Sequence, residues 1–381
     1  ADSYLKSRGE SHLRALGLDF INFTGVRNHE KLTMGQDILV SHSYSLAPAL
    51  TGGGAKRLVA TVGDLRNLDG TYFNSQKSAA FDAHYKAGGM SLLKSLGYEA
   101  ISFTGIRFDS QLTLVETLLV THSYVLQPRG DSIKFVAGVT DIKNLDGTRL
   151  TAQQSVKFDA HFRAGEGVVL KQLAYDFLSF TGVRHDELTN NQSLLVSHNY
   201  ALQAGGVGVG ARKFVAAVSD IRNLDGSRLN AGQSANLDTH FRNGGASLLN
   251  RLGYEAISFT GIRNHELLTQ GRDLLVTHNY ALQITPLVFG FGVRDFVAGV
   301  SDIRKVDGSR LGRVESALLD AHFKAGGVSL IASLGYQMIS FTGVRNERNL
   351  TRGEDMLVTH NYSLQAGYFG LGAQRFVSTV H

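Results

Sequence analysis

Apolar and polar residues alternate along several short stretches of the chain. In the segment 194–203, "LLVSHNYALQ", every second side chain falls on the same face, since strand side chains point alternately to opposite faces. The segments 99–107, "EAISFTGIR", and 213–222, "KFVAAVSDIR", are rich in β-branched and aromatic residues. We therefore predict a strand over each of these three segments.

A different spacing marks the segment 81–98, "FDAHYKAGGMSLLKSLGY". Its apolar residues, such as Leu92, Leu93 and Leu96, recur at helical intervals. A helix is therefore expected, with a break or kink at Gly88 and Gly89, because glycine in a helix interior is costly. The serines that precede this segment and its relatives are expected to be the N-caps. They are Ser78, Ser155, Ser234 and Ser316.

These elements recur through the whole chain. The phrase "FTG" begins at Phe23, Phe103, Phe180, Phe259 and Phe341, so the period is about 80 residues. Read from the "SHNY" strand, one repeat has the order ββαβ. The 381 residues then divide into an αβ half-unit (1–37), four units (38–115, 116–192, 193–272 and 273–354) and a ββ half-unit (355–381).

The two terminal pieces are complementary halves of a fifth unit. We therefore expect one α+β repeat domain over 1–381, with five ββαβ units closed into a pseudo-five-fold, α/β-propeller-like ring. The N-terminal αβ piece would complete the C-terminal ββ piece and remove the exposed sheet edges. An open, solenoid-like array is the alternative. The architecture resembles that of the pentein α/β-propellers, but no motif supports membership, and their usual nucleophile, cysteine, is absent.

Composition excludes several classes of function. The chain has no cysteine, which rules out disulfides, thiolate metal ligands and cysteine nucleophiles. The net charge of +5 is spread along the chain without a lysine or arginine block, so we expect no nucleic-acid partner. No stretch approaches the roughly 20 apolar residues of a membrane helix, so no transmembrane segment is expected.

Three polar residue types stand at fixed places in all five repeats. They are the arginines that end the FTG strand (Arg27, Arg107, Arg184, Arg263 and Arg345), the histidines of the "SHNY" strand (His42, His122, His198, His278 and His360) and its tyrosines (Tyr44, Tyr124, Tyr200, Tyr280 and Tyr362). Arginine offers a planar fork of donors to carboxylates and sulfates, and tyrosine and histidine offer a stacking edge. These residues are our candidates for ligand contacts.

Each candidate also has a structural interpretation. The arginine could form an ion pair with the aspartate of "SDI" or with that of "DAH", such as Asp82. The histidine and tyrosine share a strand face with valine and leucine, which favours a packing position in the core. Five histidines could hold a metal only if their strands lined a ring axis, because at least three ligands must converge.

The "DIRNLDG" phrase invites comparison with calcium loops. Asp220, Asn223 and Asp225 are spaced by three and two residues, and no acidic residue closes the loop consistently. An ordinary Asp-Gly turn explains the phrase better, so we expect no cofactor and only a weak case for calcium.

Nearly every distinctive polar residue occurs four or five times, whereas an enzyme needs one set of singular residues. We therefore expect a non-enzymatic, multivalent binding protein of lectin or adhesin type, secreted or at the cell surface, with repeated sites for carbohydrate or another anionic surface ligand. The alternatives are a self-associating shell, matrix or filament protein and, third, a metal-dependent enzyme at a ring axis. Variable loops at 47–56, 127–134, 203–213 and 283–295 are expected to be surface tips that add selectivity.

Overall fold

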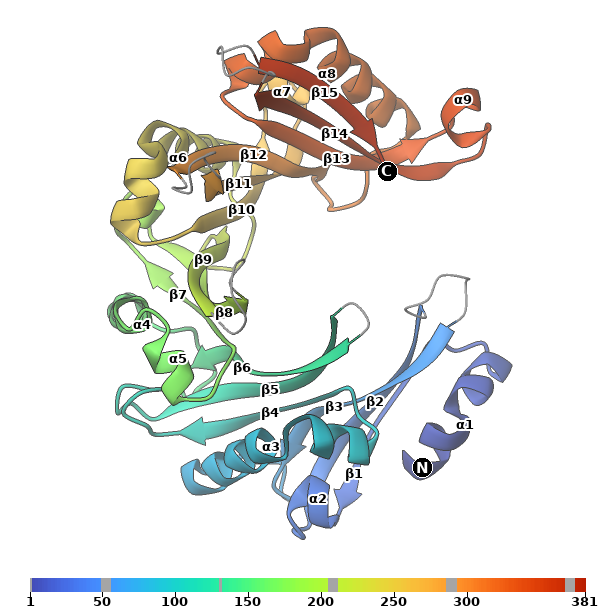
Figure 1. The fold of residues 1–381 in the computed structure, drawn as a ribbon, viewed down its shortest axis with the longest axis vertical. Helices are drawn as coiled ribbons and strands as arrows, with labels where there is room; N and C mark the ends of the chain where they lie inside the picture. Colours follow the sequence, from blue (N-terminus) through green and yellow to red (C-terminus); the bar gives the residue numbers. More distant parts are fainter. Residues whose placement is uncertain (1, 49–55, 130–131, 205–211, 286–292, 367–373) are drawn as a thin grey trace. The chain divides into compact units, whose positions relative to one another are not determined.

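The computed structural model describes residues 2–48, 56–129, 132–204, 212–285, 293–366 and 374–381. Their strands form one mixed sheet, in which the strand order follows the chain from β1 to β15 (Figure 1). Each repeat contributes a helical segment followed by three strands. The predicted α/β repeat character is therefore confirmed, and a repeat can equally be cut as αβββ.

The elements have the following bounds. The strands are β1 (Phe20–Arg27), β2 (Ile38–Pro48), β3 (Lys56–Arg66), β4 (Ala100–Arg107), β5 (Leu118–Arg129), β6 (Ser132–Lys143), β7 (Phe177–Arg184), β8 (Leu194–Ala204), β9 (Arg212–Arg222), β10 (Ala256–Arg263), β11 (Leu274–Thr285), β12 (Val293–Lys305), β13 (Met338–Arg345), β14 (Met356–Ala366) and β15 (Gln374–Val380). The helices are α1 (Asp2–Ala15), α2 (Glu30–Thr33), α3 (Ser75–Leu96), α4 (Ala152–Ala164), α5 (Val168–Gln172), α6 (Ala231–Leu252), α7 (Glu266–Thr269), α8 (Arg313–Leu334) and α9 (Arg348–Thr351), with a 3₁₀ turn η1 at Glu187–Thr189.

The described chain divides into two compact units. One comprises Ala1–Thr181 with Tyr200–Phe214, and the other comprises Gly182–Asn199 with Val215–His381. Within a repeat the strands pair antiparallel, as β4 does with β5 and β5 with β6. Successive repeats join by a short parallel contact, such as that of β3 with β4.

The sheet begins at β1 and ends at β15. Closure into a ring would require these two strands to pair, and no such pair occurs among the strands that the structure describes. The ring therefore stays a prediction. The glycine-rich tips 49–55, 130–131, 205–211 and 286–292 lie outside the described residues, and so does the prediction made for them.

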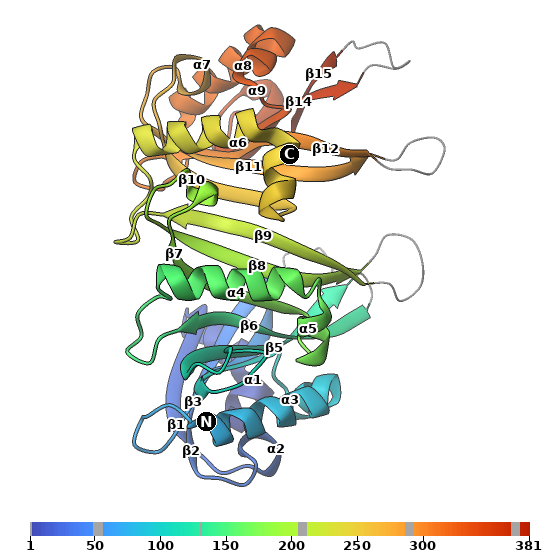
Figure 2. The same ribbon diagram turned by 90° about the vertical axis from the view of Figure 1, so that its left-hand side faces the viewer.

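Long helices cover one face of the sheet in each unit. Helix α3 contacts β4, β5 and β6, while α6 contacts β10–β12 and α8 contacts β13–β15 (Figure 2). In β4 the side chains on the helix face are buried and those on the other face are half-buried. The helix face carries Ile101, Phe103 and the buried Arg107, whereas the helix-free face carries Ser102 and Thr104.

The predicted N-cap serines were wrong. Helix α3 is capped by Asn74, whose side chain accepts from Lys77 N, and Ser78 lies fully buried inside the helix. Ser78 is buried because helix α3 and strand β4 approach each other closely at this point. A Cβ on Gly105 would lie 2.5 Å from Ser78 Oγ. The recurring glycine of "FTG" and the recurring serine are therefore two halves of one contact.

The predicted helix kink is confirmed. Gly89 interrupts α3 with φ 49° and ψ −138°, a left-handed backbone conformation that glycine adopts without a steric penalty. Gly245 in α6 and Gly327 in α8 show the same interruption. Among the described residues, no helix has the length and apolar character needed to cross a membrane.

Candidate functional site

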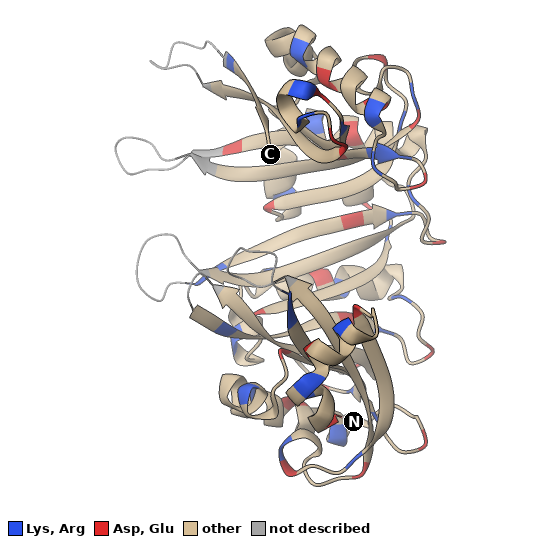
Figure 3. Cartoon of the chain, turned by 90° about the vertical axis from the view of Figure 1, so that its right-hand side faces the viewer, with Lys and Arg blue, Asp and Glu red and all other residues tan. Residues whose placement is uncertain are grey.

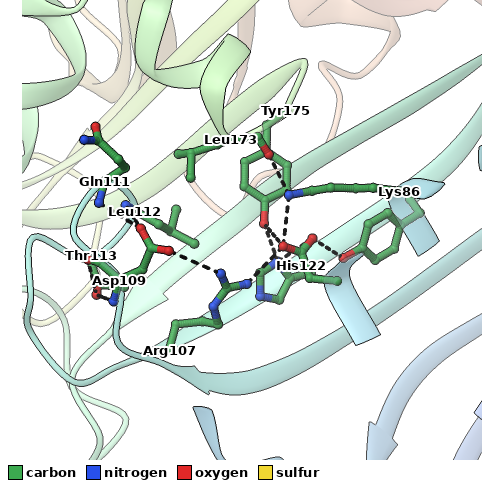
Figure 4. Close-up of polar contacts among 11 residues, drawn as sticks. Lys86, Arg107, Asp109, Gln111, Leu112, Thr113, His122, Leu173 and Tyr175 are labelled. Carbon is green, nitrogen blue, oxygen red and sulfur yellow. Dashed lines mark hydrogen bonds and ion pairs between the residues drawn. The ribbon is translucent and has the colours of Figure 1, made fainter. Parts of the chain in front are cut away.

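The predicted arginine, histidine and tyrosine of one repeat meet at the aspartate of its "DAH" phrase. In the second repeat Asp82 accepts from Tyr124 Oη at 2.7 Å and from Arg107 Nη1 at 3.0 Å. Lys86, one helical turn after Asp82, donates to the same carboxylate at 2.9 Å. Figure 4 shows Lys86, Arg107 and His122 converging from a helix and two strands.

The ion-pair interpretation of the arginine is confirmed for the "DAH" aspartate. Other repeats have corresponding pairs, among them Arg263–Asp238 at 3.3 Å, Arg345–Asp320 at 3.2 Å and, where "DSY" replaces "DAH", Arg27–Asp2 at 3.1 Å. The "SDI" aspartates pair with other arginines, as Asp302 does with Arg310 at 3.0 Å. Burial alone would raise the pKa of Asp82, but His122, Lys86 and Tyr124 lower it to about 2.

A second tyrosine comes from the following repeat. Tyr175 Oη lies 2.9 Å from Asp82 Oδ2 and 2.9 Å from His122 Nδ1. A carboxylate can only accept, so the tyrosine hydroxyl donates to Asp82 and accepts from the histidine. This assignment places the histidine proton on Nδ1. The same tyrosine–histidine contact joins Tyr98 to His42 at 2.9 Å, Tyr254 to His198 at 2.9 Å and Tyr336 to His278 at 3.1 Å.

The basic residue on the helix also reaches into the next repeat. Lys86 Nζ donates to the carbonyl of Leu173 at 2.6 Å, at the end of the next helical segment. Lys6 contacts Leu96 O at 2.6 Å, and Arg242 contacts Leu334 O at 3.1 Å. We call this set of contacts the repeat junction: the aspartate, histidine, tyrosine and base of one repeat, with the tyrosine and helix-end carbonyl of the next.

The repeat junction is buried. His122, Tyr124 and Tyr175 expose 0%, 0% and 2% of their surface, and Arg107 exposes 7%. A ligand could reach these side chains only if the next repeat moved away. The second tyrosine was not predicted, although the sequence contains a signal for it. "LGYE", "LAYD" or "LGYQ" directly precedes the FTG strand in four repeats, and only the first repeat has "LGLD".

The buried histidines predict an acid-dependent loss of stability. Burial lowers the pKa of His122 from 6.5 to about 3 and that of His42 to about 4. Between pH 6.5 and those values the unfolded chain binds more protons than the folded one, so stability is full above pH 6.5 and falls as the pH decreases. Urea denaturation across this window should show the decline. The imidazole NMR signals of both residues should not titrate between about pH 7 and about pH 5, and a shift there would contradict the assignment.

A different arrangement lies on the helix-free face of the second unit. A cavity of ≈ 230 Å³ is lined by Arg228, Thr260, Leu275, Thr277, Asp302, Arg304 and Gly308. The Thr260 and Thr277 hydroxyls lie 2.9 Å apart. Asp302 pairs with Arg304 and Arg310. The cavity thus offers hydroxyl groups, one carboxylate and two guanidinium groups, and we call it the threonine pocket.

A β-bulge places the carboxylate in the threonine pocket. Thr277 pairs with Asp302 but the next residue, His278, pairs with Val300, so Ser301 is the extra residue. Residues opposite each other share a face, and therefore Asp302 joins the threonines while Val300 stays with the buried histidine. The same shift occurs after Ser41 and after Thr121.

The threonine pair recurs in other repeats. The hydroxyl pairs are Thr24–Ser41 at 2.8 Å, Thr104–Thr121 at 2.9 Å and Thr342–Thr359 at 2.9 Å. Acidic and basic residues are interspersed along both units (Figure 3). Across the part of the chain that the structure describes, no three histidine or acidic side chains are grouped as a metal would need. In the "DIRNLDG" turn, Asp225 accepts from Ser227 N at 2.9 Å.

No protein-family model matches the sequence. No curated protein matches it either. Among solved structures, the chain is similar to the central domain of yeast acetyl-CoA carboxylase, with 10% identity and a TM-score of 0.21. That match covers 78% of this chain and 53% of the carboxylase chain, so this chain spans about half the length of its structural neighbour. A likeness with so low a TM-score carries no argument about fold or function.

Proposed function

We propose that this protein is a non-enzymatic, multivalent carbohydrate-binding protein whose sites lie on the helix-free face of the sheet. The observation that carries the proposal is the threonine pocket between β10, β11 and β12. Its polar groups are those that hydrogen-bond sugar hydroxyls, and its arginines could donate hydrogen bonds to an acidic substituent. Recurrence of the threonine pair in other repeats supports several weak sites that act together.

The proposed binding site lies away from the predicted arginine, histidine and tyrosine sets. In the second repeat, for example, those side chains are covered by the third repeat, and their hydrogen bonds go to protein groups. By contrast, Thr260 and Thr277 are half-buried, and a solute can reach them. Sugar hydroxyls could replace the mutual hydrogen bond of the two threonines without leaving a buried donor unpaired.

The test is glycan binding by the whole chain. A glycan array followed by calorimetry should give a stoichiometry well above one sugar per chain. The double variant Thr260→Val/Thr277→Val should lower that stoichiometry and leave the melting temperature within a few degrees, because valine is close to threonine in shape and the site is half-buried. Absence of binding to any glycan would contradict the proposal.

A matched control lies on the helix side of the same unit. A larger hollow of ≈ 460 Å³ next to α6 is lined by Asn190, Asn236, Thr239, His240 and Arg251, among others. The variant Asn236→Ala should leave glycan binding unchanged. If Asn236→Ala abolished binding while the threonine variant bound normally, the sugar would lie in the hollow next to α6 and not in the threonine pocket.

Self-association is the second candidate function. It is favoured by the two end strands, β1 and β15, each of which has a neighbour on one side only in the strand order. Unpaired strand edges recruit other strands. The predicted five-fold ring would close the same edges within one chain, and sedimentation velocity distinguishes a closed monomer from a concentration-dependent assembly.

A further inference from the structure

We propose that the outer edge of the fifth repeat is a docking site for a repeat of the same type whose first strand starts with alanine directly after Tyr-Glu, and that the N-terminal repeat of this chain does not fit it. The site comprises Asp320, Lys324, His360, Arg375 and Thr379. This inference is independent of the proposed carbohydrate binding.

The first observation is an incomplete repeat junction. His360 is 1% exposed, and its Nδ1 has no hydrogen-bond partner. Nδ1 lies 3.4 Å from Asp320 Oδ1, but the contact does not satisfy it. In His42, His122 and His278 the same nitrogen contacts a tyrosine hydroxyl of the next repeat. A buried polar atom without a partner is costly, so a phenol is what this position is built to receive.

The second observation concerns Lys324. It donates to Asp320 at 3.0 Å, as Lys86 does to Asp82 at 2.9 Å. Lys86 also reaches a helix-end carbonyl of the next repeat, and its side chain is 18% exposed. The side chain of Lys324 is 50% exposed. In a docked repeat, the backbone carbonyl of the residue two places before the tyrosine would accept a hydrogen bond from Lys324.

The third observation is a size match at the parallel strand contact. Thr61 pairs with Ala100 and Ala217 with Ala256, while Gly138 pairs with Phe177 and Gly299 with Met338. Where the second strand of a pair begins with phenylalanine or methionine, the residue opposite is glycine. Where it begins with alanine, the residue opposite is threonine or alanine. The Gly138 position has no room, because a Cβ there would lie 2.4 Å from the Phe177 ring.

Thr379 occupies this position in the fifth repeat. It pairs with Asn361, as Gly299 pairs with Asn279. By the size match, Thr379 faces a strand that starts with alanine, as Thr61 does. Arg375 corresponds to Arg57, which forms an ion pair with Glu99, the residue just before Ala100. The sequence Tyr-Glu-Ala, found at 98–100 and 254–256, therefore meets all three requirements of the site.

The N-terminal repeat of this chain meets only one of the three requirements of the docking site. Asp19 could pair with Arg375, but Leu18 stands where the other repeats have tyrosine, and Phe20 stands where alanine is required. Leucine would leave His360 unsatisfied, and phenylalanine would collide with Thr379 as it would with any Cβ at Gly138. The two ends of this chain are not complementary, which argues against closure of the ring and against head-to-tail pairing of two copies. Self-association would then pair β1 with β1 or β15 with β15 of a second copy.

The experiment uses the full chain and three peptides of equal length taken from its own sequence. They are 95–107 ("SLGYEAISFTGIR"), 15–27 ("ALGLDFINFTGVR") and 172–184 ("QLAYDFLSFTGVR"). Calorimetry should show 1:1 binding of the first peptide only. Loss of the hydroxyl in a Tyr98→Phe version should weaken binding about tenfold, the cost of one buried hydrogen bond.

The variant Thr379→Gly provides the matched control. It should admit the third peptide, in which phenylalanine follows Tyr-Asp, and it should still exclude the second, which lacks tyrosine. Equal binding of all three peptides to the unaltered protein would show unselective edge pairing and overturn the proposal. Binding that changes neither with the Tyr98→Phe peptide nor with the Thr379→Gly variant would also overturn the proposal. Absence of binding of peptide 95–107 would overturn it as well.

Discussion

Replacing Asp238 by alanine is expected to lower the free energy of unfolding by about 3–5 kcal/mol, because it leaves buried charged and polar partners without their acceptor. Asp238 is fully buried. It accepts from Tyr280 at 2.7 Å and from Tyr336 at 2.9 Å, and it pairs with Arg242 at 3.0 Å. Urea denaturation followed by circular dichroism measures the loss, as a lower midpoint at the same far-UV signal before unfolding.

Asp320 is the matched control for Asp238. It stands at the same place in the next repeat and accepts from Tyr362 at 2.6 Å. It receives no tyrosine from a following repeat among the described residues, and its lysine partner is half-exposed. Asp320→Ala should therefore cost clearly less than Asp238→Ala. Equal losses would mean that the tyrosine of the next repeat contributes nothing to the junction.

The second large effect is expected at Gly138. A Cβ there would lie 2.4–2.5 Å from three atoms of the Phe177 ring, so Gly138→Ala forces the ring or the strand to move. Overpacking of this kind costs about 1–3 kcal/mol. Thermal unfolding of the variant should show the corresponding decrease in melting temperature. Gly299→Ala is the comparison, because its nearest contact is at 3.1 Å and its cost should be smaller.

A second substitution tests the cause. Gly138→Ala with Phe177→Ala recreates the alanine pair that Ala217 and Ala256 form in the next repeat. In a double-mutant cycle the combined loss should be smaller than the sum of the two single losses, because the steric conflict exists only when both large groups are present. Strict additivity would refute the size match.

Most of the repeat could be predicted from the sequence, because its signals are local. The alternation in "LLVSHNYALQ" and the Gly88-Gly89 pair each report the conformation of their own segment. The N-cap at Asn74 was missed because Ser78 is also a good capping residue. The burial of Ser78 depends on Gly105, which lies far along the chain, and this contact is visible only in the packed structure.

The candidate site was harder to predict for the same reason. Strand alternation shows that His122 and Tyr124 share a face, but it does not show what covers that face. Their cover includes Tyr175, which is 53 residues from His122. The threonine pocket depends on a β-bulge that shifts the register by one residue, and no pattern in "SDIR" signals it.

The size match at the strand contacts has a consequence for folding. Near-identical repeats in one chain tend to pair with the wrong neighbour or to swap between molecules during folding. A strand that begins with Phe177 can pair only beside a glycine such as Gly138. A strand that begins with Ala100 or Ala256 would leave a gap if it paired beside Gly138. The first residue of each strand thus helps to direct it to its own place in the chain order, even though the rest of the strand is almost the same in every repeat.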